Sequence, residues 1–149
     1  MDTTLADILL VEDDPQDVEL MLHTLRRNNI TDNVSIRVAR DGAEALEFIF
    51  CTGAHAGRDA PNNPKVVLLD LRLPKVNGLE VLERVRGDSR TRGIPVVVLS
   101  ASAEGPDVAR ARELGVSGCI VKPVDLTQFA SAMRDLGLHW MLGNAIPDK

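Results

Sequence analysis

The chain has 149 residues, and its 17 Lys and Arg against 22 Asp and Glu give it a formal net charge of −5. This length fits one compact domain with its own hydrophobic core, so we expect a single domain over residues 1–149. The acidic charge and the few aromatic residues, three Phe and one Trp, argue against a nucleic-acid-binding groove, and the lack of any run of about 18 apolar residues argues against a membrane span.

The two cysteines do not indicate a disulfide framework or a zinc site. Cys51 and Cys119 lie far apart in the chain, with no CxxC pair and no neighbouring histidine. No N-terminal apolar run follows a basic start, so the sequence does not predict a secretory signal. We therefore expect a soluble protein in the reducing cytoplasm.

Five short apolar runs predict β-strands. Val34 to Ala39 alternates apolar and polar residues, which indicates a half-exposed edge strand. The other four runs are continuous and rich in Val, Ile and Leu, which is typical of strands covered on both faces in a parallel sheet: Ile8 to Val11, Val66 to Leu69, Pro95 to Leu99, and Cys119 to Val121.

Stretches with helical period separate the strands, and each has a start signal. Asp14 and Pro15 open the first, while Gly105 and Pro106 open the fourth, which has Gly115 as its stop. The other three begin with an Asp or Asn three residues before a Glu or Gln, a pattern similar to the capping box: Asp41 with Glu44, Asn77 with Glu80, and Asp125 with Gln128.

The order of strand then helix, repeated five times, predicts a doubly wound α/β domain with a five-stranded parallel sheet. A flavodoxin-like strand order 2-1-3-4-5 would place the third strand between the first and the fourth. Thr52 to Pro64 is rich in Gly, Asn and Pro and predicts a long loop. In the last helix, a stripe at helical spacing predicts core packing: Phe129, Met133, Leu136 and Trp140.

Polar residues directly follow four of the predicted strands. They are Glu12, Asp13 and Asp14 after the first strand, Asp70 after the third, Ser100 after the fourth, and Lys122 after the fifth. Ligands of open parallel sheets bind outside the carboxyl ends of the strands, so we expect these side chains to meet at one edge. Asp14 is better explained as the cap of the first helix.

Carboxylates held close together repel one another and raise the pKa of at least one of them, and a small hard dication such as Mg²⁺ relieves that repulsion. A carboxylate can also attack phosphorus when the charge on the transferred oxygens is stabilised. The residues therefore predict Asp70 as a nucleophile that forms an aspartyl phosphate. Glu12 and Asp13 would hold the metal. Ser100 would donate a hydrogen bond to one phosphoryl oxygen, and Lys122 would pair with another.

Four segments resemble the receiver domain of two-component response regulators: LLVEDD (9–14), LLDLRLPKVNGLEVL (68–82), VVVLSA (96–101) and CIVKPV (119–124). The resemblance spans about residues 6–137 and leaves a C-terminal extension over 138–149. It implies a flavodoxin-like receiver fold and a signalling switch, not an enzyme, that accepts a phosphoryl group on Asp70 from a sensor histidine kinase in a phosphorelay.

A narrower resemblance concerns the type of regulator. No helix-turn-helix or enzyme domain accompanies the receiver segments, which implies a stand-alone regulator with protein–protein output. The loop at 52–64 and the tail with Trp140 and Ile146-Pro147 are similar to those of regulators paired with bacterial phytochrome kinases. A bacteriophytochrome is thus the kinase that the resemblance implies.

The family pattern also implies a ligand set for the metal. Asp13 and Asp70 would ligate Mg²⁺, with Mn²⁺ as the alternative ion, together with the backbone carbonyl of Arg72. Glu12 would assist through water.

The same pattern implies residues that contact the phosphoryl group or control its loss. Ser100, Ala101 and Lys122 would contact it, with Ser100 as the switch hydroxyl, and the bond from Lys122 to Pro123 would be cis. Arg72 and Ser102 lie two residues beyond the nucleophile and the switch residue, where side chains shield the phosphate from water. We expect Arg72 to slow hydrolysis, because a guanidinium can pair with phosphoryl oxygens.

Cys119 departs from the family pattern. Three residues before the lysine the family usually has Tyr or Phe, whose ring moves when the switch hydroxyl turns toward the phosphate, and this chain has a thiol there. We expect Cys119 to be a small buried residue. The hypothesis is that the aromatic half of the switch is absent and that the signal leaves through a different rearrangement of the loop after Ser100.

The apolar residues near the C-terminus predict a homodimer through the last helix and the tail, since exposed apolar patches mark partner surfaces. They are Trp140, Met141, Leu142 and Ile146.

Three other functions compete with the signalling switch. A Mg²⁺-dependent phosphohydrolase of the haloacid dehalogenase type would need a second Asp two residues after the nucleophile, where this chain has Arg72, and a cap domain. A flavin or dinucleotide carrier would need a GxGxxG motif or stacking aromatics. A degenerate scaffold is disfavoured because every expected site residue is present.

Overall fold

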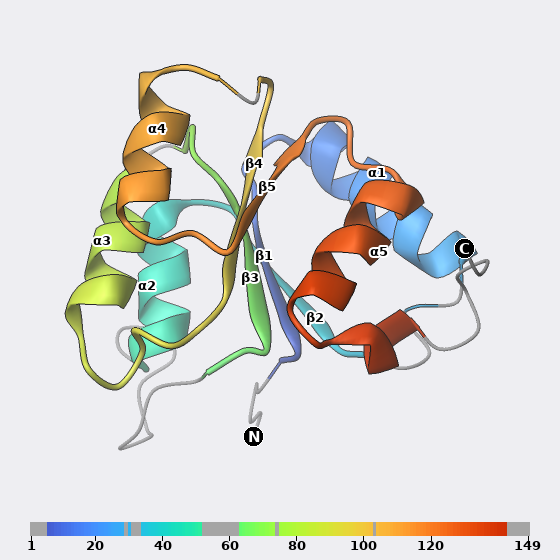
Figure 1. Cartoon of the computed structure of the whole chain (residues 1–149), viewed down its shortest axis with the longest axis horizontal. Helices are drawn as coiled ribbons and strands as arrows, with labels where there is room; N and C mark the ends of the chain where they lie inside the picture. Colours follow the sequence, from blue (N-terminus) through green and yellow to red (C-terminus); the bar gives the residue numbers. More distant parts are fainter. Residues whose placement is uncertain are drawn as a thin grey trace.

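The computed structural model describes residues 6–28, 30, 34–51, 63–73, 75–102 and 104–142. Five parallel strands form one sheet in the order β2-β1-β3-β4-β5 (Figure 1), so the predicted strand order is confirmed. The strands are β1 (Ile8–Val11), β2 (Ile36–Ala39), β3 (Val66–Asp70), β4 (Val96–Ser100) and β5 (Gly118–Val121).

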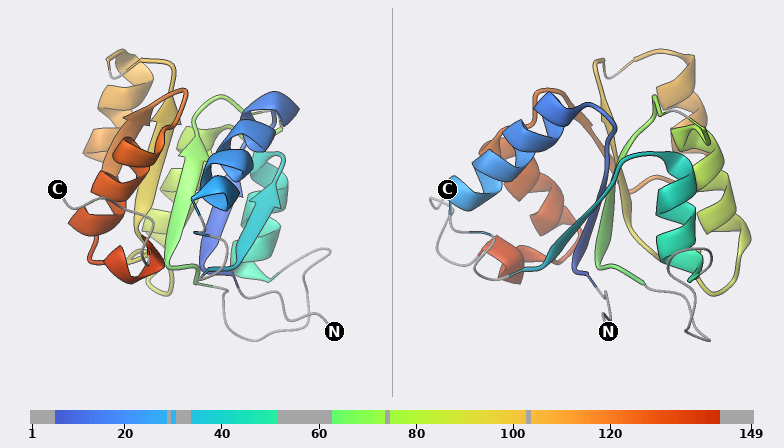
Figure 2. Two further views of the ribbon diagram at one scale, coloured as in Figure 1. Left: turned by 90° about the vertical axis from the view of Figure 1, so that its right-hand side faces the viewer. Right: turned by 180° about the vertical axis from the view of Figure 1, so that it is seen from behind.

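Five helices cover both faces of this sheet. In Figure 1 and in the rear view of Figure 2, α1 and α5 lie on one face, and α2, α3 and α4 lie on the other. Their bounds are α1 (Pro15–Arg27), α2 (Gly42–Phe50), α3 (Gly78–Gly87), α4 (Pro106–Glu113) and α5 (Leu126–Asp135), followed by the short 3-10 helix η3 (His139–Leu142). In the described ranges, none of these helices has the length and apolar character needed to cross a membrane.

The predicted helix starts are confirmed by their capping hydrogen bonds. The Asp14 side chain accepts a bond from the Gln16 amide at 2.9 Å. The same kind of bond, which satisfies an amide that the helix leaves free, caps three more helices: Glu44 N to Asp41 at 2.7 Å, Glu80 N to Asn77 at 3.0 Å, and Gln128 N to Asp125 at 2.8 Å. The fourth helix starts after Gly105, as predicted, and Gly115 follows its end with a φ of +86°.

Alternate residues of the central strands face two separate apolar cores. Leu9 and Val11 pack with α2 and α3, whereas Ile8 and Leu10 pack with α1 and α5. Every residue of β3 is buried, which explains why its sequence is continuously apolar up to the final aspartate. Burial of each such Val or Leu side chain contributes about 1.5–3 kcal/mol before entropy costs. The two cores fix the sheet rigidly under its carboxyl edge.

The strand register aligns the carboxyl ends of neighbouring strands at one edge of the sheet. Val11 of β1 pairs with Leu69 of β3, and Ser100 of β4 pairs with Val121 of β5. Asp70 therefore ends its strand one residue beyond the end of β1, and Lys122 follows directly after its own strand. This alignment is what puts residues from distant parts of the chain at one edge.

The prediction for the last helix was partly wrong. Phe129 and Met133 are fully buried, as expected, but the Trp140 side chain is 45 % exposed. The reason is that α5 ends at Asp135 and the chain turns at Gly137, whose φ is +75°. Residues beyond this turn no longer follow the stripe of α5. In the predicted loop at 52–64, residues 52–62 lie outside the described part of the chain.

Met141 and Leu142 also differ from expectation. Both were predicted to belong to an exposed apolar surface, yet they are 0 % and 3 % exposed, because η3 folds them into the core under α1 and α5. Ile146 lies outside the described residues.

Candidate functional site

Three carboxylates converge at the carboxyl edge of the sheet. Glu12 and Asp13 follow β1, Asp70 ends β3, and their side chains offer oxygens that all lie within 4.8 Å of one another. Glu12 and Asp70 are buried, while Asp13 is exposed. The structure thus brings together the three acids that the sequence analysis predicted as a group.

A single ammonium group faces this acidic cluster. The Nζ atom of Lys122, directly after β5, donates to Asp70 Oδ2 at 3.0 Å and to Glu12 Oε1 at 3.0 Å. It also donates to Asp17 Oδ2 at 3.1 Å, from the first turn of α1. The peptide bond between Lys122 and Pro123 is cis, as the family resemblance implied.

The second oxygens of the two buried acids are held by backbone amides. Asp70 Oδ1 accepts a hydrogen bond from the Arg72 amide at 2.9 Å, and Glu12 Oε2 accepts one from the Asp14 amide at 3.2 Å. Each carboxylate is therefore fixed between an amide and the ammonium of Lys122. Such fixing sets the direction in which the Asp70 oxygens can react.

The charges of the cluster do not balance. Burial, together with the neighbouring Asp70, raises the pKa of Glu12 to about 7, although the hydrogen bond from Lys122 acts in the opposite direction. Burial would lower the pKa of Lys122, but hydrogen bonds to Asp70, Glu12 and Asp17 raise it above its ordinary value. Among the described residues, the Lys122 ammonium thus faces four carboxylates, those of Glu12, Asp13, Asp17 and Asp70. This surplus of negative oxygen at hydrogen-bonding distances is the donor set that a hard dication prefers.

A hollow of about 320 Å³ opens above Asp70. Lys122, Ser100 and Arg72 line it together with the first residues of α4. The Ser100 hydroxyl accepts a hydrogen bond from the Ser102 amide at 3.3 Å. Ala101 and Ser102 are exposed at the rim. A phosphoryl group fits this space and would meet the residues predicted to contact it.

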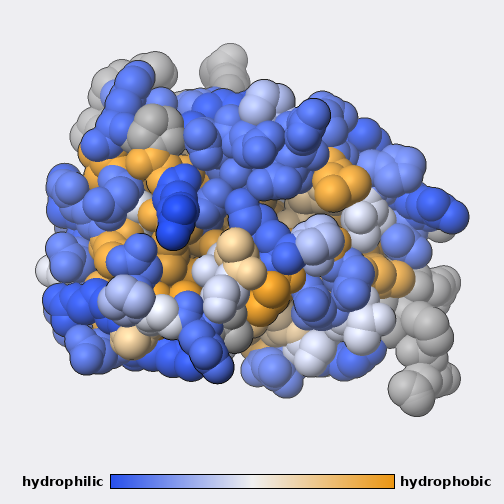
Figure 3. All heavy atoms as spheres, turned by 90° about the horizontal axis from the view of Figure 1, so that it is seen from above, coloured by the Kyte–Doolittle hydropathy of each residue, from blue (hydrophilic) through white to orange (hydrophobic). Residues whose placement is uncertain are grey.

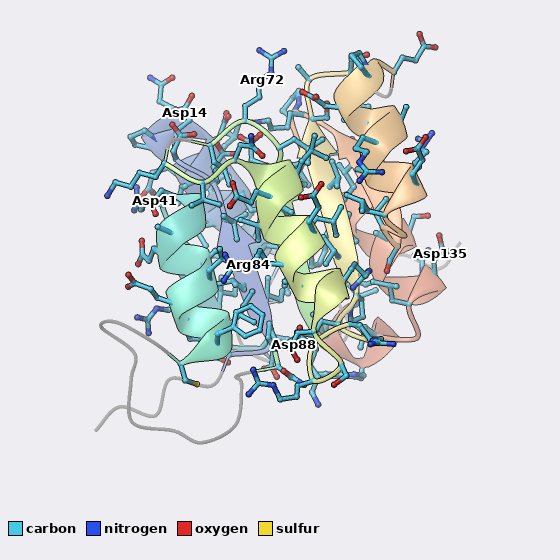
Figure 4. The ribbon with its side chains drawn as sticks, turned by 90° about the vertical axis from the view of Figure 1, so that its left-hand side faces the viewer. Asp14, Asp41, Arg72, Arg84, Asp88 and Asp135 are labelled. Carbon is cyan, nitrogen blue, oxygen red and sulfur yellow. The ribbon has the colours of Figure 1, made fainter. Side chains whose placement is uncertain are left out.

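The edge around the hollow is polar. Figure 3, which looks down on the carboxyl edge, shows hydrophilic residues over most of this face with smaller hydrophobic areas between them. Figure 4 places Asp14 and Arg72 at this edge, with Arg72 extending outward from the loop after β3, and Asp88 at the opposite end of the domain. The Arg72 side chain is exposed and free to reach across the hollow.

Asp17 is the residue that the sequence analysis missed. It lies in the first turn of α1, where an acidic residue is already explained by the helix dipole, so its sequence position gave no separate signal for the site. Asp14, by contrast, caps α1, as expected.

Cys119 is half-buried, so the prediction of a buried thiol was wrong. It packs against the core on the α4 side of the sheet. The reason for its exposure is that β5 is an edge strand, and Cys119 borders an open hollow of about 450 Å³ that runs between this strand and Thr127 and Ser131 of α5.

Comparison with known proteins agrees with this geometry. Residues 8–134 match the response regulator receiver domain. The bacteriophytochrome response regulator AtBRR is 49 % identical, with a TM-score of 0.80 over 92 % of this chain and 96 % of that chain. The bacteriophytochrome response regulator RtBRR is 46 % identical, with a TM-score of 0.80 over 98 % of this chain and 84 % of that chain.

A third relative is the response regulator Rcp1 of Synechocystis, 33 % identical over 94 % of this chain and 92 % of Rcp1. The structure of the Mn²⁺-bound form of Rcp1 is 32 % identical, with a TM-score of 0.70 over 95 % of this chain and 98 % of that chain. The fold, the level strand ends and these similarities agree, and the chain therefore belongs to the family of response regulator receiver domains.

Proposed function

We propose that this response regulator accepts a phosphoryl group on Asp70 from a sensor histidine kinase, in a reaction that needs Mg²⁺, and that phosphorylation changes its affinity for a protein partner. The observation that carries the proposal is the setting of Asp70. Its side chain is 7 % exposed, it lies beside Glu12 and Asp13, and one oxygen is 3.0 Å from Lys122. A surface aspartate would have no such partners.

The residues present fit a divalent cation. Asp13 and Asp70 would hold it with the backbone carbonyl of Arg72, and Glu12 would assist through water. Burial is the main cause of the raised pKa of Glu12, and the neighbouring Asp70 adds repulsion that a dication would relieve. Bound there, Mg²⁺ would neutralise charge on the transferred phosphoryl oxygens. Mn²⁺ is an alternative ion, as the Mn²⁺-bound form of Rcp1 suggests.

Asp70 would act as the nucleophile in the transfer. A bond forms between phosphorus and one Asp70 oxygen while the bond between phosphorus and the donor imidazole nitrogen breaks, and the electron pair of that bond returns to the imidazole. Lys122 would pair with a phosphoryl oxygen, and the Ser100 hydroxyl would turn from the Ser102 amide to donate to another. The protein contributes position and charge, which is how phosphoryl transfer is generally assisted.

The kinase that fits best is a bacteriophytochrome. The identities of 49 % and 46 % to two bacteriophytochrome response regulators support this choice. The chain would act as a single domain over residues 1–149. It would form a homodimer through the last helix and the tail, with the exposed Trp140 at the contact.

A phosphohydrolase is not better supported. The position two residues after Asp70 holds Arg72, whose guanidinium cannot serve as an acid and base at neutral pH. The phosphohydrolase alternative would be favoured if the protein released phosphate from small phosphorylated substrates at many turnovers per protein.

The test is incubation with acetyl phosphate and Mg²⁺ followed by intact mass measurement. We expect one phosphoryl adduct on the wild type and none on Asp70→Asn or in the presence of a chelator. Asp88→Asn is a matched control, because Asp88 lies at the opposite end of the domain and should leave the adduct unchanged. An adduct that persists in Asp70→Asn would overturn the proposal.

A further inference from the structure

Lys122 has more partners than its expected role requires. Its ammonium has three N–H donors, and each is used by a different carboxylate: Glu12 at 3.0 Å, Asp70 at 3.0 Å and Asp17 at 3.1 Å. Two of these acids belong to the cluster that would bind a cation and a phosphoryl group. Asp17 does not.

The two cluster acids change their bonding during the proposed reaction. Asp70 would share its negative charge with a bound cation, and Glu12 would turn toward the water of that cation. Both therefore become weaker partners for the ammonium once the cation is bound, before a phosphoryl oxygen is there to pair with it.

Asp17 keeps its carboxylate throughout. It is held by the first turn of α1, one turn after the capping bond of Asp14, so its position is set by the helix and not by the contents of the site. Its side chain is 36 % exposed, compared with 21 % for Lys122. An ion pair as exposed as this adds little to the free energy of unfolding. The pair can nevertheless fix where the Lys122 ammonium lies.

A lysine has a flexible four-carbon stem and a strongly hydrated charge. If its contacts to Glu12 and Asp70 weakened together and nothing else held it, Lys122 could rotate toward solvent. We propose that Asp17 is a positioning residue that anchors the Lys122 ammonium beside Asp70 while its other two partners are engaged in the reaction. This inference rests on the proposed function of Asp70, because it concerns how the same site holds its lysine during phosphoryl transfer.

The anchor has a measurable signature. Ammonium protons that are hydrogen-bonded exchange slowly with water and give an NMR signal from ¹⁵N-labelled lysine, whereas those of freely rotating lysines are lost to exchange. The Lys122 signal, identified by its absence in Lys122→Met, would be recorded without metal, with Mg²⁺, and with Mg²⁺ and beryllofluoride, which mimics a phosphoryl group on Asp70.

We expect the wild type to keep the signal in all three forms. Asp17→Asn should show it without metal, where Glu12 and Asp70 still hold the ammonium, and should lose it with Mg²⁺ alone, before a phosphoryl oxygen is present to pair with the ammonium. Glu19→Gln is the matched control, since Glu19 is an exposed acid of the same helix whose contact is a distant one to Arg26 at 4.0 Å. It removes the same charge and should behave as the wild type does.

The rate of phosphorylation by acetyl phosphate at saturating Mg²⁺ provides the second readout. It should fall by about two- to fivefold in Asp17→Asn, which is the range for loss of one partly exposed ion pair, and Asp17→Glu should restore part of it. A signal that survives Mg²⁺ alone in Asp17→Asn would overturn the inference, as would an unchanged rate. If the wild type does not bind beryllofluoride or accept phosphate, the proposed function itself fails and this inference falls with it.

Discussion

The ammonium of Lys122 lies 3.0 Å from Oδ2 of Asp70, although 52 residues separate the two in the sequence. The contact depends on the sheet, because β4 lies between β3 and β5 and holds their carboxyl ends level. Asp70 ends a strand that is buried between two apolar cores, whereas Lys122 follows a half-buried edge strand that is held against the sheet by β4. The chemistry of the site therefore rests on packing that extends across the whole domain.

Arg72→Ala should speed the loss of phosphate from the phosphorylated protein. The exposed guanidinium lines the hollow above Asp70 and can pair with phosphoryl oxygens, which keeps water away from phosphorus. We expect an increase of about two- to fivefold, the range for an exposed ion pair, in the decay of the phosphorylated mass. Arg84→Ala is the control, because Figure 4 places Arg84 along α3 and below the carboxyl edge. An unchanged decay rate in Arg72→Ala would end this explanation.

Cys119 should keep its position when the site is filled. The small side chain on β5 has no ring to move, so the signal should leave through the segment after Ser100, where Ala101 and Ser102 are exposed. Crystal structures with and without beryllofluoride and Mg²⁺ would test this. We expect displacement of that segment with little change at Cys119. An aromatic residue from elsewhere entering the space beside Cys119 would show that the switch has kept a ring.

Gly42→Ala should lower the free energy of unfolding by about 1–3 kcal/mol, the usual cost of overpacking. A Cβ atom at this position would collide with the backbone carbonyl of Val76 in the loop between β3 and α3. Urea denaturation measures the change. Gly87→Ala, at the end of α3, is the matched control, since a Cβ there meets nothing within 4 Å. If the Gly42→Ala protein is as stable as the Gly87→Ala protein, the loop that contains Val76 moves aside at no cost in stability, and this prediction is wrong.

The helix caps and the strand order could be predicted from the sequence, and features that depend on the rotation of a helix or on a turn could not. The cap at Asp41 was predictable because the residue and its amide partner are three positions apart. The convergence on Asp70 followed from the strand order alone. The contact of Asp17 with Lys122 depends on how α1 is rotated against the sheet, and no local pattern sets that rotation. The exposure of Trp140 depends on the turn at Gly137, which a helical stripe does not reveal.

Trp140 should take part in a homodimer. Met141 and Leu142 are buried in the core. Trp140 is therefore the exposed large apolar side chain of the described C-terminal segment. Sedimentation at micromolar concentration should show a dimer for the wild type and a shift toward monomer for Trp140→Ser. Leu20→Ser is the control, because it removes another exposed apolar side chain from α1. A wild-type monomer both with and without phosphorylation would refute the dimer.

The location of the phosphoryl group tests the central claim most directly. After phosphorylation in the presence of Mg²⁺, borohydride reduction converts an aspartyl phosphate to homoserine, which peptide mass spectrometry then assigns to a position. The setting of Asp70 between Lys122 and the Arg72 amide predicts homoserine at position 70. Homoserine at position 13 or 17, or phosphate on a residue other than aspartate, would contradict it.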